Sequence, residues 1–179
     1  MNDLKKKRAL RWSFVLAWTV FTYATLYIVR PICEYLKVTT PFNLIVNIVL
    51  FGLLFGIILV TIHLGNVRKR YTFSLLLIAV VAYVSGFIAL KIPEEKVHFI
   101  EYGFLAFLTL QALLVDMKRA TAYLLAFVIV SLIGWGDEGI QYLLPNRYYQ
   151  LQDVLLNAVS GAMGLFLTFV IKRENEILR

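Results

Sequence analysis

The sequence has few charged residues and almost no cysteine. Only 16% of its 179 residues are charged, whereas 60% are hydrophobic, and the mean hydropathy is +0.77. This composition excludes an ordinary soluble globular domain and indicates an integral membrane protein. The single cysteine, Cys33, excludes an intrachain disulfide. No soluble domain, linker or low-complexity tract interrupts the chain, so we predict one membrane domain over residues 1–179.

The common enzyme and cofactor signatures are also missing. The chain has no Walker loop, no Gly-x-Ser-x-Gly, no His-Glu-x-x-His and no dinucleotide fingerprint. Its two histidines are too few for a usual zinc site, so we expect neither a metal nor a cofactor. The net charge of +7 comes from short basic clusters beside apolar runs, without the basic and aromatic interleaving that holds a nucleic-acid strand. Nucleic acid is therefore not an expected partner.

Six apolar segments predict an all-α bundle of about six transmembrane helices. They cover residues 12–29, 42–64, 71–90, 97–115, 120–144 and 151–171, and each is long enough to cross a hydrocarbon core of about 30 Å. All four prolines lie in the breaks between segments, where they favour turns and helix ends. We expect the first segment to be retained, because no signal-peptide cleavage pattern follows it. The Gly52-x-x-x-Gly56 motif predicts close helix packing.

The distribution of charge predicts the orientation in the membrane. With the N-terminus inside, 13 of the 18 Lys and Arg residues fall on the cytoplasmic side and 5 on the outer side. This asymmetry places both termini in the cytoplasm. Of the 11 Asp and Glu residues, 7 fall at or near the outer side. The outer end of the bundle is therefore predicted to be acidic.

Polar side chains recur at helical spacing near the outer ends of four segments. Such residues face other helices, because polar side chains inside a membrane need protein partners. They are Asn43 and Asn47 on the second segment; His98, Glu101 and Tyr102 on the fourth; Asp137, Glu138 and Gln141 on the fifth; and Asp153, Asn157 and Ser160 with Gly161 and Gly164 on the sixth.

The adjacent acids Asp137 and Glu138 are the most informative of these residues. A charged side chain at a bilayer centre costs about 2.5 to 3.5 kcal/mol, so the pair needs an interface, water or a partner. Arg147, in the following loop, is the obvious counter-charge and is equally suited to a lipid phosphate. Asp153 either caps the last helix or joins the site, and Asn157 either links helices or joins the site.

Three ordered motif blocks in this region resemble the VanZ-like family. They are 96–102 with its Lys-x-His-Phe-x-x-Tyr pattern, 137–141 with Asp-Glu-x-x-Gln, and Arg147 followed by 153–157, Gly161 and Gly164. The resemblance is best over residues 96–164 and predicts a VanZ-like core over about 42–171. It implies a small bacterial multi-pass protein of the inner (cytoplasmic) membrane. The family's namesake is linked to resistance to teicoplanin, a glycopeptide that acts on cell-wall precursors at the outer surface.

These observations favour an outward-facing polar pocket that binds a cell-envelope lipid headgroup, a lipid-linked precursor or a glycopeptide-like amphiphile. Two alternatives stay open. One is a membrane-embedded hydrolase or transferase with His98, Asp137, Glu138 and Asp153 as candidate catalytic groups. The other is a structural or assembly subunit whose polar residues only fix helix packing. The predicted pocket residues are His98, Tyr102, Asp137, Glu138, Gln141, Arg147, Asp153 and Asn157.

Overall fold

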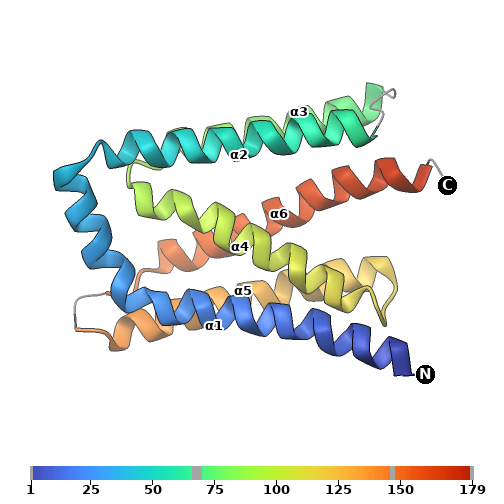
Figure 1. Ribbon diagram of the computed structural model, residues 1–179, viewed down its shortest axis with the longest axis horizontal. Helices are drawn as coiled ribbons and strands as arrows, with labels where there is room; N and C mark the ends of the chain where they lie inside the picture. Colours follow the sequence, from blue (N-terminus) through green and yellow to red (C-terminus); the bar gives the residue numbers. More distant parts are fainter. Residues whose placement is uncertain (1, 66–69, 146–147, 178–179) are drawn as a thin grey trace.

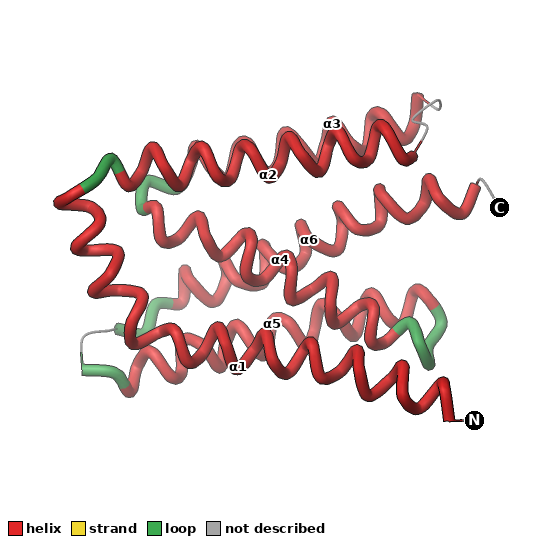
Figure 2. Tube along the Cα trace, viewed as in Figure 1, coloured by secondary structure: helices red, strands yellow, loops and turns green. Residues whose placement is uncertain are grey.

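The computed structural model describes residues 2–65, 70–145 and 148–177, and within them every regular element is an α-helix. Most of the helices run lengthwise through the bundle, with α4 and α6 crossing each other, and the loops lie at its two ends (Figures 1 and 2). The predicted segments 42–64, 71–90, 97–115, 120–144 and 151–171 each fall on one helix, which confirms the all-α prediction. The six helices of this described part are α1 (Asn2–Thr39), α2 (Phe42–Gly65), α3 (Arg70–Ala89), α4 (Pro93–Leu113), α5 (Arg119–Leu143) and α6 (Leu151–Ile177).

Five of these helices, α1, α2, α3, α5 and α6, are long and apolar enough to cross a membrane. α4 differs because its first three turns carry three glutamates, a lysine and a histidine. It lies between its neighbours, with its most extensive packing against α6 and further packing against α1, α2 and α5 (Figure 1). A helix surrounded by protein does not need a lipid-compatible surface, so its polar residues are tolerated there. The prediction of apolar spans is confirmed for five helices, and α4 is the polar centre of the bundle.

The sequence predicts that the first helix ends before Pro31, and this prediction is wrong. α1 continues through Pro31 to Thr39 and bends sharply in its second half (Figure 1). Proline removes one backbone hydrogen bond and its ring clashes with the preceding turn, which bends a helix that neighbouring contacts keep intact. The stretch after the bend crosses the end of the bundle, where Lys37 forms a 2.5 Å ion pair with Glu94 of α4.

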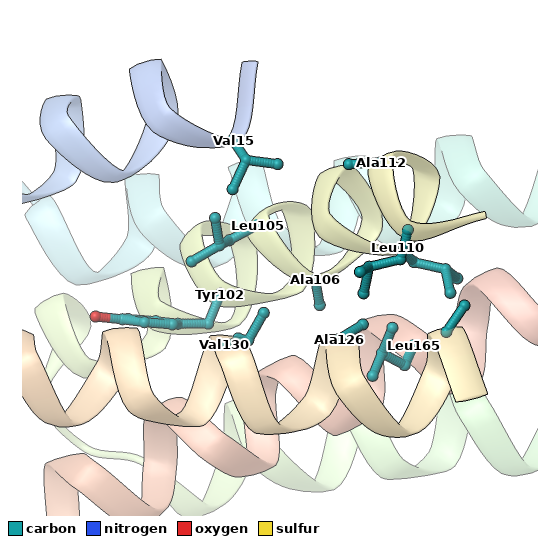
Figure 3. Close-up of a cluster of buried hydrophobic side chains, with 11 residues drawn as sticks. Val15, Tyr102, Leu105, Ala106, Leu110, Ala112, Ala126, Val130 and Leu165 are labelled. Carbon is teal, nitrogen blue, oxygen red and sulfur yellow. The ribbon is translucent and has the colours of Figure 1, made fainter. Parts of the chain in front are cut away.

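Two clusters of buried apolar side chains lie on either side of the α4–α6 pair. The first joins α1, α4, α5 and α6, and Figure 3 shows Leu105, Ala106 and Leu110 of α4 within it. The second joins α2 and α3 to α4 and α6 and contains Tyr83 and Phe99. Since lipid tails are as apolar as these side chains, close packing rather than exclusion of water holds the helices together.

Glycines on α6 permit the close approach of this helix to α4 and α5. A Cβ atom at Gly164 would lie 2.5 Å from the Cα of Gly103 and 2.6 Å from its carbonyl oxygen. A Cβ at Gly161 would lie 2.8 Å from the Val130 side chain of α5. The prediction for Gly52 and Gly56 is wrong, because nothing lies within 4 Å of a Cβ at either position. Spacing alone did not show which small residues face a neighbouring helix.

The first turns of α1 and the last turns of α6 lie at the same end of the bundle (Figure 1). At this end Arg8 forms a 2.5 Å ion pair with Asp116, and Arg11 donates a hydrogen bond to the carbonyl oxygen of Gln111. We call the opposite end, with residues 40–41, 90–92, 144–145 and 148–150, the distal end. A common location for both termini agrees with the predicted topology, whereas the side of the membrane stays a prediction.

Replacing Gly164 by alanine tests the close approach of α4 and α6. The added methyl group must push the two backbones apart, so we expect Gly164→Ala to cost about 1 to 3 kcal/mol of unfolding free energy. Gly52→Ala is the matched control, which we expect to be neutral or slightly stabilising because alanine is the better helix former. Thermal unfolding in detergent checks this, and equal midpoints for the two variants would contradict the packing.

Cysteine labelling tests the predicted orientation. With Cys33 replaced by serine, a cysteine at exposed Tyr148 of the distal end should react with a membrane-impermeant maleimide in intact cells. A cysteine at Met117, an exposed residue at the opposite end, should react only after permeabilisation. The reverse pattern would place the distal end in the cytoplasm.

Candidate functional site

The predicted site residues that the structure describes lie at the distal end, on α4, α5 and α6. We call Tyr102, Asp137, Glu138, Gln141 and Asn157 the polar cluster. All five are buried, with exposed fractions of 4% or less, and they interlock three helices. The sequence correctly predicted that spacing along separate helices would bring these side chains to one level.

Asp137 is fully buried in α5 and is held by α4. The Tyr102 hydroxyl donates a 2.6 Å hydrogen bond to Oδ2 of Asp137. Gly134 permits this contact, because a Cβ atom there would lie 3.2 Å from the Tyr102 ring and 2.7 Å from Cβ of Asn157. A hydrogen bond to a carboxylate is short and strong, and burial makes it costly to lose.

Glu138 is also fully buried, and its carboxylate accepts hydrogen bonds both from α5 and from the residue just before α6. Gln141, one turn later on α5, donates a 2.8 Å hydrogen bond to Oε1. The backbone N–H of Gln150 donates a 3.2 Å hydrogen bond to Oε2. Glu138 therefore positions the chain that leads into α6, a role that the sequence did not indicate because a backbone group has no side-chain signal.

Asn157 links α6 to α5 from inside the bundle. Its Nδ2 atom donates a 3.2 Å hydrogen bond to the carbonyl oxygen of Gly134. Its Oδ1 atom and the hydroxyl of Ser160 are buried, and neither has a hydrogen-bond partner in residues 2–65, 70–145 and 148–177. The helix-linking interpretation of Asn157 is supported by this contact, and it places the residue beside the acids as well.

His98 and Glu101 extend the cluster toward α1. Nδ1 of His98 lies 3.7 Å from a Glu101 carboxylate oxygen, and the imidazole stacks on the Tyr102 ring with centroids 5.8 Å apart. Both residues line a cavity of about 70 Å³ together with Glu94 and Gln141. A water occupies about 30 Å³, so this cavity has room for about two waters beside groups that exchange protons.

Asp153 lies in the first turn of α6, one turn before Asn157, and is half-buried. There a carboxylate interacts favourably with the helix dipole, as the capping interpretation predicts. It also belongs to an acidic group at the start of α4: burial raises the pKa of Glu95 above its usual range, and the charges of Asp153 and Glu94 raise it further. This acidity at the distal end agrees with the charge distribution in the sequence.

Arg147 lies outside the described residues, so its predicted place in the rim of the pocket stays a prediction. Within the described ranges, no three His, Cys, Asp or Glu side chains come together in a way that could hold a metal ion.

Residues of α1 form a wall of the site that sequence reasoning missed. Trp18 donates a 3.0 Å hydrogen bond from Nε1 to the carbonyl oxygen of Glu101, and the Tyr23 hydroxyl donates a 2.6 Å bond to that of Ile133. Thr22 and Thr25 line the small cavity. The available signal was the spacing of Trp18, Thr22 and Thr25, which places three polar groups on one face of an apolar helix.

Lys96 is the other missed residue. It is 4% exposed and donates hydrogen bonds to the side-chain oxygens of Asn47, at 2.8 Å, and Asn43, at 3.3 Å. The sequence placed the two asparagines at the correct level but gave them no partner. The available signal was a lysine at helical spacing from Phe99 and Ile100, where a buried ammonium group needs acceptors.

Removing the Tyr102 hydroxyl tests the bond that holds Asp137. Tyr102→Phe leaves the carboxylate without this donor, so we expect a loss of about 1 to 3 kcal/mol of unfolding free energy. Tyr83→Phe is the matched control, because Tyr83 is buried and the structure gives its hydroxyl no hydrogen bond to any described residue. Thermal unfolding of both variants in detergent checks this; a Tyr102→Phe midpoint equal to that of Tyr83→Phe would argue against the bond.

Comparison with known proteins agrees with the motif blocks. The VanZ/LLP1 family model matches residues 94–172, which run from the first turn of α4 into α6. No curated protein and no solved structure gives a significant match. The match contains all the predicted pocket residues but begins at α4, so the extension of the VanZ-like core back to residue 42 stays a prediction. Over residues 94–172, the chain is therefore similar to the VanZ/LLP1 family.

Proposed function

We propose that this protein binds the polar headgroup of a cell-envelope lipid, lipid-linked precursor or glycopeptide-like amphiphile at the distal end. Through this binding it contributes to glycopeptide resistance or envelope homeostasis. The observation that carries the proposal is the complete burial of two adjacent carboxylates, Asp137 and Glu138, in an apolar helix. Helix packing alone is served better by small or apolar residues, so retaining two acids favours a role in recognition.

The arrangement of the carboxylates favours a ligand with cationic or hydroxyl groups. Tyr102, Gln141 and the N–H of Gln150 orient the two acids, and Glu94, Glu95 and Asp153 add negative charge at the same end. A site lined by oriented acceptors attracts hydrogen-bond donors such as ammonium and hydroxyl groups. Arg147, which follows α5, is proposed as the partner for a phosphate of the same ligand.

The cavities of the distal end support binding of a group of headgroup size. A cavity of about 460 Å³ lies between the bend of α1 and the end of α5, and it falls in the usual size range of small-molecule sites. Its walls include Arg30 and Glu34, which form a 3.1 Å ion pair. Leu26 lines both this cavity and the smaller one beside His98. A headgroup in the cavity of about 460 Å³ is therefore separated by the Leu26 side chain from the smaller cavity, which His98, Glu101 and Gln141 line.

The smaller cavity gives a specific reason to keep the enzyme alternative. It combines room for about two waters with the His98–Glu101 pair, and Gln141, which binds Glu138, lies in its wall. Hydrolysis of a lipid-linked substrate requires a water within hydrogen-bond distance of a proton acceptor. Turnover of a labelled precursor by purified protein, lost in Glu138→Gln, would establish this function in place of binding alone.

Carboxamide replacements test the proposed role in resistance. In cells whose glycopeptide tolerance depends on this protein, Asp137→Asn and Glu138→Gln should each return susceptibility to the level of the deletion strain. Their expression should persist, because the amides keep the size of the acids. Asp116→Asn is the control, since Asp116 pairs with Arg8 at the opposite end. Minimum inhibitory concentrations measure the susceptibility, and membrane immunoblots measure the expression. Full resistance in both site variants would contradict the proposal.

A further inference from the structure

The side of α4 that faces α2 carries polar contacts that the proposed function does not use. Lys96 reaches the side-chain oxygens of Asn47 and Asn43, as described above. Lys96 is buried, Asn47 is half-buried and Asn43 is exposed. The three side chains therefore form a graded path from the surface to the ammonium group, and the longer contact is the one at the surface. We call Asn43, Asn47 and Lys96 the lysine–amide cluster.

The lysine–amide cluster has a positive charge that its own contacts do not neutralise. Among the residues that the structure describes, no carboxylate lies within ion-pair distance of Lys96. Buried charges are ordinarily paired with an opposite charge, and amides supply only dipoles. An ammonium group has three N–H donors, of which the two asparagines take two. One donor and the net charge are left for an anion.

An apolar groove starts one helical turn from this charge. It has a volume of about 420 Å³ and lies between α2, α3, α4 and α6. Leu50 of the groove follows Asn47 by three residues, and Phe99 and Ile100 follow Lys96 by three and four. At helical spacing these residues lie directly inward of the lysine–amide cluster. Gly103 and Gly164, where α4 and α6 approach each other closely, also line the groove.

We propose that this groove binds one membrane lipid with an anionic headgroup. Its acyl chain lies along Leu50, Leu53, Ile57 and Phe104, and its phosphate accepts a hydrogen bond from Lys96 beside Asn43. A single cation at one end of an apolar groove matches the head-and-tail chemistry of such a lipid. An apolar helix from a second copy of the chain would leave the charge unused. The site contains no residue of the polar cluster and lies on another side of α4, so it is independent of the proposed function.

Lipid binding by the purified full-length protein tests this site. Native mass spectrometry with phosphatidylglycerol and phosphatidylcholine of identical acyl chains should show one tightly bound lipid and a preference for phosphatidylglycerol of about tenfold or more. Both lipids offer a phosphate to Lys96, but the choline ammonium cancels the net negative charge of phosphatidylcholine and is repelled by the lysine. Lys96→Gln should abolish the preference and Lys96→Arg should keep it. Lys91→Gln, which removes an exposed lysine at the same level, is the control and should also keep it.

A second pair of variants tests the apolar part of the site. Leu53 lines the groove and is 48% exposed, so Leu53→Trp should fill the groove and remove the tightly bound lipid. Leu59→Trp, at a 50% exposed position of the same helix that does not line the groove, should leave it bound.

Four results would overturn the proposal. The first is that wild-type protein binds the two lipids equally, and the second is that Lys96→Gln and Lys91→Gln show the same lipid preference. The third is that sn-glycerol 3-phosphate competes as strongly as the intact lipid. The fourth is that the protein forms dimers without lipid and that Leu53→Trp dissociates them. The first uses wild-type protein, so it holds even where Lys96→Gln does not fold.

Discussion

The burial of two adjacent carboxylates in an apolar helix is the constraint on which the rest of this structure depends. In a membrane such groups must be hydrogen-bonded and covered by protein, because lipid supplies no donors. Asp137 obtains a donor from Tyr102 of α4, and Glu138 obtains donors from Gln141 and the backbone of Gln150. The fold therefore surrounds the end of α5 with polar segments instead of exposing it.

Two features of the fold follow from this need for coverage. α4 has the residues of a partly polar helix and occupies the centre of the bundle, where its side chains meet protein. Glycines at 134, 161 and 164 let α4, α5 and α6 approach until short polar side chains can reach each other. The bent α1 then closes the distal end, with Lys37 bound to Glu94 and Trp18 bound to the backbone of Glu101.

The sequence predicted the helices and named all five residues of the polar cluster, because both depend on local spacing. Apolar length defined the spans, and i, i+3 and i+4 spacing brought His98 and Glu101 together and placed the asparagines of α2 at the correct level. What failed depends on tertiary contacts: the persistence of α1 through Pro31, the open surroundings of Gly52 and Gly56, and the acceptors of Lys96. These outcomes are decided by which helix lies opposite each residue, and spacing within one helix does not contain that information.

The central claim is that the buried acids at the distal end exist to bind an envelope ligand. Equilibrium binding of a labelled lipid-linked cell-wall precursor to the protein in nanodiscs tests this most directly, with wild-type protein compared with Glu138→Gln. A binding role for the acids predicts saturable binding by the wild-type protein that is lost in the variant while the thermal unfolding of the variant stays cooperative. Absence of saturable binding by the wild-type protein, or equal binding by both, would contradict it.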